Sequence, residues 1–350
     1  MKIRHVASSV AALALVTALA ACGGTSSAGT SPTASASGAS VTVYSADGLA
    51  AWYTPMFQQF TQQTGIKVNY VEAGSSEVVG RVEKEKANPQ ADVLVTLPPF
   101  IQQAAADGML DPIGVDTSAI PAADKDPNGH YTALVNNYSC FIVNNTVSPK
   151  PATWDDLLSP SYKGKLQYST PGQAGDGTAL LILLEHEMGT TNALDYLKKL
   201  QANNVGPSSS TGALQPKVSS GSLSVANGDV QMNLSSIAQD KSNFSVIFPA
   251  NGTATPEMVA LPYDAGLVKN APHAAAGKQL LTFLLSAEAQ QQVTTLAFGI
   301  PVRSDVTPSG DSYTQLQAAI KGKDVYHPDW DAVLTSLDSM VAAYNNAVGA

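Results

Sequence analysis

The stretch Tyr168-Ser-Thr-Pro-Gly-Gln-Ala-Gly-Asp-Gly-Thr178 joins a short predicted strand, Lys165–Tyr168, to an apolar helix that starts with Ala179-Leu-Leu-Ile-Leu-Leu184. Glycine lets a backbone approach a ligand closely, and we expect Asp176 or Thr178 to cap the helix. A helix N-terminus carries partial positive charge and free N–H groups, so this junction is a candidate anion site. The glycine spacing matches neither a P-loop nor a dinucleotide fingerprint. Taken alone, the stretch is equally compatible with a tight structural turn.

Strands and helices alternate in the first part of the chain. Strands are predicted at Val41–Tyr44, Ile66–Val71 and Ala91–Leu97; the helices that follow them run from Leu49 to Gly65, from Ser75 as cap through Val82, and from Phe100 to Asp107. This alternation predicts a mostly parallel sheet with helices on both faces. In such sheets, ligands bind beyond the carboxyl ends of the strands. The candidate ligand-binding residues at these ends are Ser45, Asp47, Ser75, Ser76, Glu77 and Thr96.

The second half of the chain has the pattern of another α/β unit. A β-like run at Tyr131–Asn144 leads into it, and Met258–Asp264 has the pattern of a return crossing. Between them we expect a helix at Thr191–Leu200 and, over Val225–Leu234, the end of a helix followed by a strand. Two further helices are predicted at Ser312–Ile320 and Trp330–Val348.

The N-terminal sequence has the order of a secretory signal. Basic residues in Met1–His5 precede an apolar run, Val6–Ala18, which is too short for a good membrane span. The run ends in Leu19-Ala-Ala-Cys22, which resembles a bacterial lipobox, so we expect 1–22 to be a lipoprotein signal with lipid on Cys22. An ordinary secretory signal is the alternative. Residues 23–40 are nearly all Gly, Ser, Thr and Ala, which predicts a flexible tether.

Composition excludes several classes of partner and chemistry. The 350 residues include 44% hydrophobic and 13% charged residues, with a net charge of −9, so a nucleic-acid partner is not expected. Cys140 lies in an apolar run and is predicted to be a core residue. The sequence has no Gly-x-Ser-x-Gly elbow and no local histidine cluster. We therefore expect no catalytic residues, no metal site and no cofactor, with a secreted hydrolase or transferase as the alternative.

Several motifs recur together in one class of protein. They are the lipobox and tether, Tyr44-Ser45, Thr64-Gly-Ile-Lys-Val68, Ala91-Asp-Val93, Asn270-Ala-Pro272, Phe283-Leu-Leu-Ser286 and Gly299-Ile-Pro-Val302. From Val41 to Arg303 the chain resembles the solute-binding proteins of bacterial ABC importers, of the two-lobed type II kind that includes ferric-binding proteins. The resemblance implies an α/β fold with two lobes, each a mostly parallel sheet flanked by helices. It also implies an interlobe ligand cleft, a hinge, an ABC permease partner and an extracytoplasmic, lipid-anchored monomer.

Within that class, Val43–Leu49, Val71–Val79, Asn88–Ile101 and Ser169–Thr178 resemble the 2-aminoethylphosphonate-binding branch. Ferric-binding relatives place two adjacent tyrosines on the metal, and this chain has no Tyr-Tyr pair; the comparable region around Asn233-Leu-Ser-Ser236 carries small polar groups. A phosphonate needs N–H and hydroxyl donors, and an ammonium needs carboxylates or aromatic faces. These requirements extend the set of candidate ligand-binding residues beyond the strand ends named above. The added residues are Tyr44, Thr170, Gly175, Gly177, Thr178, Tyr263 and Asp264.

The resulting prediction is a solute-binding lipoprotein that captures 2-aminoethylphosphonate and delivers it to a permease. One lobe is expected to hold residues 41–135 plus 261–303, and the other 138–257 plus 304–350. The alternatives are a binding protein for a polyamine, thiamine or ferric ion.

Overall fold

The computed structural model describes residues 39–349, which belong to one compact unit. The predicted signal at 1–22, the lipidation site Cys22 and nearly all of the predicted tether lie outside the described residues. Ser40, predicted as the last tether residue, already belongs to the first strand.

The first sheet has six strands in the order β2-β1-β3-β11-β4, with β5 also paired to β11. Their bounds are β1 Ser40–Ala46, β2 Lys67–Ala73, β3 Val93–Thr96, β4 Leu110–Asp111, β5 Tyr131–Val135 and β11 Tyr263–Val268. The strands β1, β2 and β3 are parallel, as predicted. The three pairings of β11 are antiparallel, so the expectation of a mostly parallel sheet is wrong. A parallel neighbour needs a crossover connection, usually a helix, whereas β11 enters directly from the return crossing.

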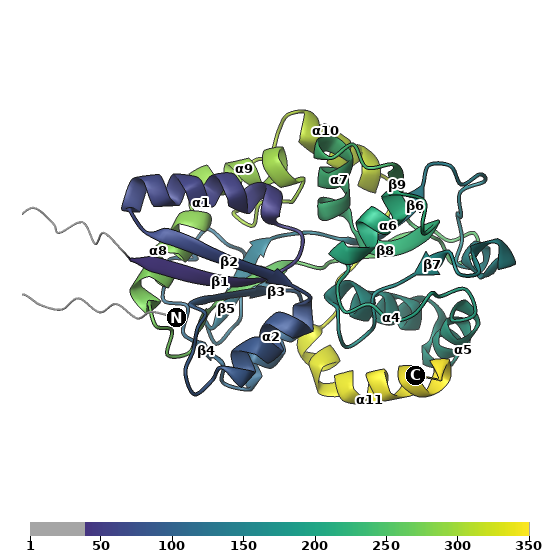
Figure 1. Cartoon of the computed structure of the whole chain (residues 1–350), viewed down its shortest axis with the longest axis horizontal. Helices are drawn as coiled ribbons and strands as arrows, with labels where there is room; N and C mark the ends of the chain where they lie inside the picture. The colour runs from purple at the N-terminus through teal and green to yellow at the C-terminus, as the bar shows by residue number, and fades with distance from the viewer. Residues whose placement is uncertain (1–38, 350) are drawn as a thin grey trace, which may run out of the picture. The chain divides into compact units, whose positions relative to one another are not determined.

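The second sheet has four strands in the order β7-β8-β6-β9 (Figure 1). They are β6 Ser139–Asn144, β7 Leu166–Gln167, β8 Val225–Asp229 and β9 Phe244–Ile247. Only β7 and β8 are parallel, because β6 pairs antiparallel with both β8 and β9. Both sheets are therefore mixed. A separate parallel pair joins β10, Glu257–Val259, to β12, Asp324–Tyr326.

The helices on the first sheet follow the apolar stripes of the sequence. They are α1 Ala50–Thr64, α2 Ser75–Lys84, α3 Phe100–Ala106, α8 Ala274–Leu284 and α9 Ala287–Ala297. Trp52, Phe57 and Phe60 lie on the buried face of α1, and Gly65 ends that helix in the left-handed conformation, as predicted. The prediction that Ser75 caps α2 is wrong: the N-cap is Gly74, with no side-chain cap.

The remaining helices are α4 Gly175–Met188, α5 Thr190–Leu200, α6 Gln215–Ser219, α7 Val230–Gln239, α10 Asp311–Ile320 and α11 Trp330–Val348. Neither Asp176 nor Thr178 caps α4, whose N-cap is Ala174 without a side-chain cap. The order expected over Val225–Leu234 is reversed, because β8 comes first and α7 follows. Asp229 fixes this boundary by accepting the N–H of Met232 at 2.7 Å.

Two chain crossings join the sheets, one between β5 and β6 and the other between β10 and β11. The helix α11 contacts both α5 and α3 (Figure 1), and α10 contacts α9 and α7. The exact lobe boundaries remain a prediction. We call the half built on the first sheet lobe I and the half built on the second sheet lobe II.

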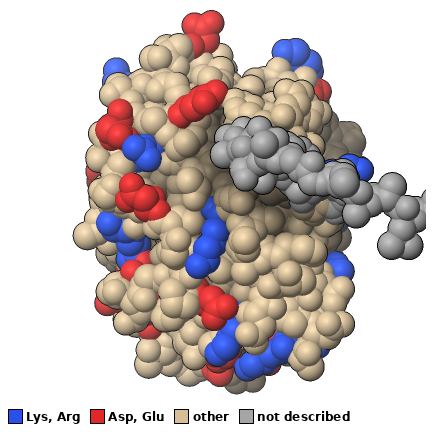
Figure 2. Space-filling view, turned by 90° about the vertical axis from the view of Figure 1, so that its left-hand side faces the viewer, with Lys and Arg blue, Asp and Glu red and all other residues tan. Residues whose placement is uncertain are grey.

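Burial tests the prediction that Cys140 is a core residue. Cys140 is a buried free cysteine, as expected of a core residue. On the face shown in Figure 2, basic and acidic side chains are interspersed among uncharged ones rather than gathered into a basic patch. None of the helices in residues 39–349 combines the length and apolar character that crossing a membrane requires.

Candidate functional site

The strand ends of lobe I lie beside one another. Asp47 and Gly48 follow β1, Ser75 follows β2, and Thr96 ends β3. The Thr96 hydroxyl donates to the carbonyl oxygen of Ser75 at 3.1 Å, so these two turns are bonded together. Because the carboxyl ends of parallel strands share one edge, the predicted grouping of these residues follows from the sheet.

Lobe II presents a matching polar edge. Ser169, after β7, donates its N–H to the Asn227 side-chain oxygen of β8 at 2.8 Å, and the Thr211 hydroxyl donates to the Ser169 hydroxyl at 3.0 Å. Asp229 ends β8, and its side chain caps α7. All four side chains are buried. Buried polar groups of this kind require partners, and here they form a connected network at the edge of the second sheet.

Hydrogen bonds connect the two polar edges directly. The N–H of Gly175, the first residue of α4, donates to the Ser75 hydroxyl oxygen at 3.2 Å. The N–H of Ser76 donates to the Gln173 carbonyl at 3.1 Å. The anion site predicted at the start of α4 therefore faces Ser75 of lobe I. In this structure the Ser75 hydroxyl oxygen, rather than a ligand, accepts the hydrogen bond from the Gly175 N–H.

Asp47 makes a second connection between the lobes. One of its carboxylate oxygens accepts from the Ser210 hydroxyl at 2.5 Å and from the Gly212 N–H at 2.7 Å. A Cβ atom at Gly212 would lie 2.5 Å from that oxygen, so this approach requires glycine. Gly48, with φ of +124°, brings the backbone equally close to Tyr263, and a Cβ there would clash with the tyrosine oxygen.

Three acidic side chains in this region lie close enough for their charges to affect one another, and none of them forms a salt bridge within residues 39–349. Asp47 comes from lobe I, and Asp176 and Asp229 come from lobe II; we call them the aspartate trio. Burial raises the pKa of Asp47, and burial together with the charge of Asp229 raises the pKa of Asp176 well above its usual range. Burial likewise raises the pKa of Asp229 to about 6, although hydrogen bonds from Met232 and neighbouring side chains oppose the shift.

A pocket of about 660 Å³ opens beside Asp47, the one member of the trio that lines it. Lobe I lines it with Asp47, Gly48, Glu72 and the start of α1, and lobe II lines it with Ser210, Gly212 and one side of α7. The pocket walls include the acids Asp47, Glu72 and Asp240 and no Lys or Arg. A pocket with this lining favours a ligand that carries positive charge.

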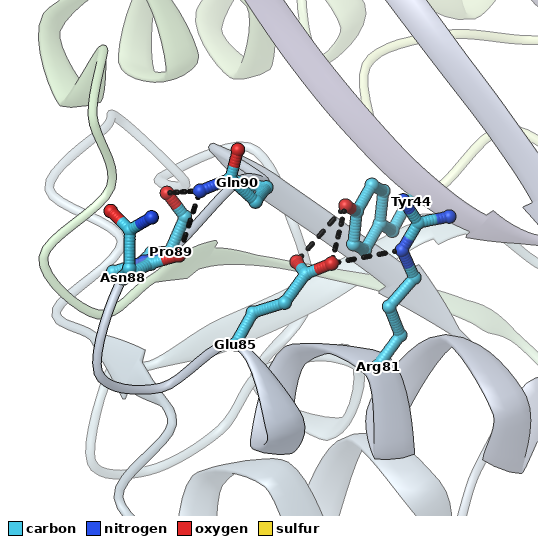
Figure 3. A network of polar contacts seen from close by, with 6 residues as sticks. All are labelled: Tyr44, Arg81, Glu85, Asn88, Pro89 and Gln90. Atoms are coloured by element: carbon cyan, nitrogen blue, oxygen red, sulfur yellow. Dashed lines mark hydrogen bonds and ion pairs between the residues drawn. The ribbon is translucent and has the colours of Figure 1, made fainter.

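The two polar edges and the contacts between them, at Ser75, Gly175 and Asp47, form what we call the polar layer. Several predicted site residues lie away from it. The Tyr44 hydroxyl donates to Glu85 at 3.0 Å, and Arg81 stacks 4.3 Å from the Tyr44 ring centre (Figure 3). Tyr44 therefore packs with α2, together with Val78, Val79 and Val82 of that helix. Asp264 is buried on β11, and this burial raises the pKa of its carboxyl group well above its usual range. Glu77 is exposed on α2.

The other predicted residues make internal contacts at or near the layer. The Ser45 hydroxyl donates to the Ala46 carbonyl at 2.8 Å. The Thr170 hydroxyl accepts from the Ser208 N–H at 3.0 Å, and a Cβ at Gly177 would clash with the Ser169 carbonyl oxygen. The Thr178 hydroxyl accepts from the Gly172 N–H at 3.0 Å and donates to the Ala174 carbonyl at 2.9 Å. Thr178 therefore holds the loop in place, whichever groups contact a ligand.

Sequence reasoning missed Asp229, Asn227 and Thr211, and it treated Asp176 only as a helix cap. The missed signal was Asp229 three residues before Met232, the spacing of an N-cap and its N–H donor. Because Val225–Leu234 was predicted as a helix followed by a strand, Asp229 was not recognised as a polar residue at the end of a strand. The prediction of no metal site can be compared with the structure only over residues 39–349. In that range, no group of three His, Cys, Asp or Glu side chains could hold a metal ion.

Comparison with known proteins identifies the family to which the chain belongs. The family model for bacterial extracellular solute-binding proteins matches residues 55–321. The chain belongs to this family. A Salmonella typhimurium protein named "Putative 2-aminoethylphosphonate-binding periplasmic protein" is 50% identical over 312 residues, covering 87% of this chain and 91% of that protein. Proteins of this family bind solutes for transport, so the chain is an extracytoplasmic solute-binding protein and not an enzyme.

Solved structures support the same fold. The periplasmic binding protein AfuA from Actinobacillus pleuropneumoniae superimposes with a TM-score of 0.73 at 19% identity, covering 89% of this chain and 99% of that one. The ferric binding protein from Campylobacter jejuni gives a TM-score of 0.71 at 21% identity, covering 88% and 99%. These likenesses confirm the predicted two-lobed type II binding-protein fold.

Proposed function

We propose that this solute-binding protein captures 2-aminoethylphosphonate between its lobes and delivers it to an ABC permease. The observation that carries the proposal is a buried polar layer that offers both kinds of partner this zwitterion needs. Helix N–H groups and hydroxyls lie at the start of α4, and carboxylates lie a short distance away. The 50% identical Salmonella relative, with the same ligand in its name, supports the choice.

The phosphonate is proposed to bind at the start of α4. That helix has no side-chain cap, and its N-terminal dipole favours an anion. The Gly175 N–H now donates to the Ser75 hydroxyl oxygen. A phosphonate oxygen entering between the lobes replaces that acceptor, and the freed Ser75 hydroxyl then donates to the same anion. In this proposal, Ser75 and Gly175 have the ligand-binding roles expected from the sequence.

A polyamine is the second candidate ligand. The acidic lining of the 660 Å³ pocket favours it, and the spermidine/putrescine-binding periplasmic protein of Escherichia coli is 25% identical over 310 residues. For a ferric ligand, the iron uptake protein A1 of Synechocystis is 26% identical over 268 residues, but the chain has no Tyr-Tyr pair to bind the metal.

The protein is further proposed to be anchored by lipid on Cys22. The support is the ordered signal sequence, with basic residues, an apolar run and then Leu19-Ala-Ala-Cys22. An anchor at this position and the Gly/Ser-rich segment after it would keep the binding lobes near the permease.

Calorimetry with purified protein, refolded to remove bound solute, tests the ligand. 2-Aminoethylphosphonate is expected to bind, and at a hundredfold excess over its Kd to stabilise the fold by about 2.7 kcal/mol. Prior dialysis against a chelator is expected to leave the affinity unchanged. Saturable binding of putrescine or spermidine without any response to the phosphonate would replace the proposal with the polyamine function.

A further inference from the structure

The aspartate trio joins carboxyl groups from three separate segments. Asp47 follows β1, Asp176 lies in the first turn of α4, and Asp229 ends β8. Asp176 is 4% exposed and Asp229 is fully buried. Gathering acids in a low-dielectric site is unfavourable when they ionise, so the ionised trio carries a free-energy cost that a bound cation would reduce.

The donors around the trio are neutral. Asp229 accepts from Met232 N–H at 2.7 Å and from the Tyr263 hydroxyl at 3.1 Å, while Asp47 accepts from Ser210 and Gly212. The salt bridges found among residues 39–349 include none of the three carboxylates. Within residues 39–349, therefore, no basic side chain forms an ion pair with them.

Asp176 also has an unused acceptor. Its Oδ1 atom is buried and has no hydrogen-bond partner within the described part of the chain. A buried acceptor without a donor costs about 1–3 kcal/mol, which a ligand that donates a hydrogen bond would recover. This atom lies in the same turn of α4 to which we assigned the phosphonate.

We infer that the aspartate trio is the subsite for the ligand's primary ammonium group, with Asp176 making the direct contact. This inference rests on the proposed function. An ammonium has three N–H donors and one positive charge, which suits a group of carboxylates with an unused acceptor. In 2-aminoethylphosphonate only two carbons separate the charges, so a phosphonate at the start of α4 leaves the ammonium beside the Asp176 side chain.

The position of the trio also links binding of the ammonium group to closure of the two lobes. Asp176 and Asp229 belong to lobe II, and Asp47 belongs to lobe I. A cation between them is attracted to both lobes and opposes the mutual repulsion of the acids. A ligand without the amino group would leave that repulsion in place and would hold the lobes together less well.

Calorimetry with three probes tests the inference: 2-aminoethylphosphonate, ethylphosphonate, which lacks the amino group, and putrescine, which lacks the phosphonate. Wild-type protein is expected to bind 2-aminoethylphosphonate on the order of tenfold to hundredfold more tightly than ethylphosphonate. Asp176→Asn keeps the side-chain shape and is expected to reduce that ratio to within a few-fold, mainly by weakening the amine-bearing ligand.

A matched control is Glu187→Gln, at the other end of α4 and about 16 Å away along the helix. Partial burial raises the pKa of Glu187 to about 7, so this variant removes a half-buried acid without touching the trio. It is expected to keep the wild-type ratio, and circular dichroism establishes that both variants fold. The comparison of ligands on wild-type protein does not depend on either variant.

The outcomes separate this inference from the proposed function. Equal affinity of wild type for 2-aminoethylphosphonate and ethylphosphonate would overturn the ammonium subsite and leave the phosphonate function standing. Tight binding of putrescine alone, lost in Asp176→Asn, would overturn the phosphonate function and support the subsite. If wild type binds neither amine, or if Asp176→Asn binds both amines like wild type, the inference is wrong.

Discussion

The hydroxyl of Tyr263 lies 3.1 Å from a carboxylate oxygen of Asp229, although the two residues belong to strands of different sheets. The same hydroxyl lies 2.8 Å from the carbonyl oxygen of Asp47. One tyrosine oxygen therefore contacts both halves of the ligand layer, and its removal has consequences for stability that can be measured.

Tyr263→Phe is expected to lower the free energy of unfolding by about 1–3 kcal/mol, because Asp229 stays buried and loses a donor. Urea denaturation measures the loss. Tyr162→Phe is the control, since Tyr162 is also buried and its hydroxyl makes no hydrogen bond found among residues 39–349. Equal effects of the two substitutions would contradict the proposed importance of the Tyr263 contacts.

The ionisation of Asp229 predicts how stability depends on pH. Its pKa is about 6 in the fold, against a usual value of 3.8, so between these values the folded state binds more protons than the unfolded state. The contribution of Asp229 is therefore fully present below about pH 4 and is lost as the pH rises through about 6. The shift of about two units corresponds to roughly 3 kcal/mol.

Asp229→Asn isolates this contribution, because asparagine retains the ability to cap α7. Unfolding free energies of wild type and variant, measured from about pH 4 to 7 without ligand, are expected to differ in slope, with the steeper fall in wild type. Parallel curves would show that Asp229 titrates as an ordinary carboxyl group.

Thr178→Val tests the internal role of the loop threonine. We expect unliganded protein to lose about 1–2 kcal/mol, because the Gly172 N–H loses its acceptor. Thr335→Val is the matched control: Thr335 is exposed on α11, and its hydroxyl donates to the carbonyl four residues earlier. Thermal unfolding with Thr178→Val no less stable than Thr335→Val would mean that this hydrogen bond contributes nothing.

Gly48→Ala is expected to destabilise the fold more than Gly206→Ala does. Both glycines have φ values that disfavour alanine, +124° and +144°, so both variants carry backbone strain of about 1–3 kcal/mol. Only Gly48→Ala adds a clash, with the oxygen of Tyr263. Chemical denaturation of both variants separates the two effects, and equal losses would show that Tyr263 moves aside freely.

Cys22→Ala tests the lipid anchor. The variant is expected either to be released into the medium or to remain unprocessed, because lipid attaches through the cysteine thiol. Cell fractionation and the mass of the mature protein measure this. Wild-type processing and membrane retention in Cys22→Ala would rule out the anchor.

Local patterns predicted well what depends on neighbours in sequence. The stripe of α1 and the αL glycine at position 65 were readable, because helix periodicity and glycine geometry act over one or two turns. Strand direction was not readable for β11, since its partners are set by a crossing from the other lobe. The same is true of the site. Asp47 and Ser75 were recognised as strand-end residues, whereas Asp229 depended on the order of β8 and α7.

The caps illustrate the same limit. Ser75 and Thr178 have the residue types of helix caps, but tertiary contacts use their hydroxyls instead, one across the lobes to Gly175 and one to the loop at Gly172. A hydroxyl has several possible partners within reach, and the sequence gives only the local ones.

The helix α11 packs on α5 of one lobe and on α3 of the other, and the Tyr344 hydroxyl donates to that of Tyr168 at 3.1 Å. A rigid rod attached to both halves cannot keep both attachments when the halves separate. We therefore expect opening to release α11 from one lobe, and the Tyr344–Tyr168 hydrogen bond favours retention of its contact with lobe II, next to the ligand loop. A fluorescent label on the opposite end of α11, near Trp330, would then report each opening event from a position outside the ligand cleft.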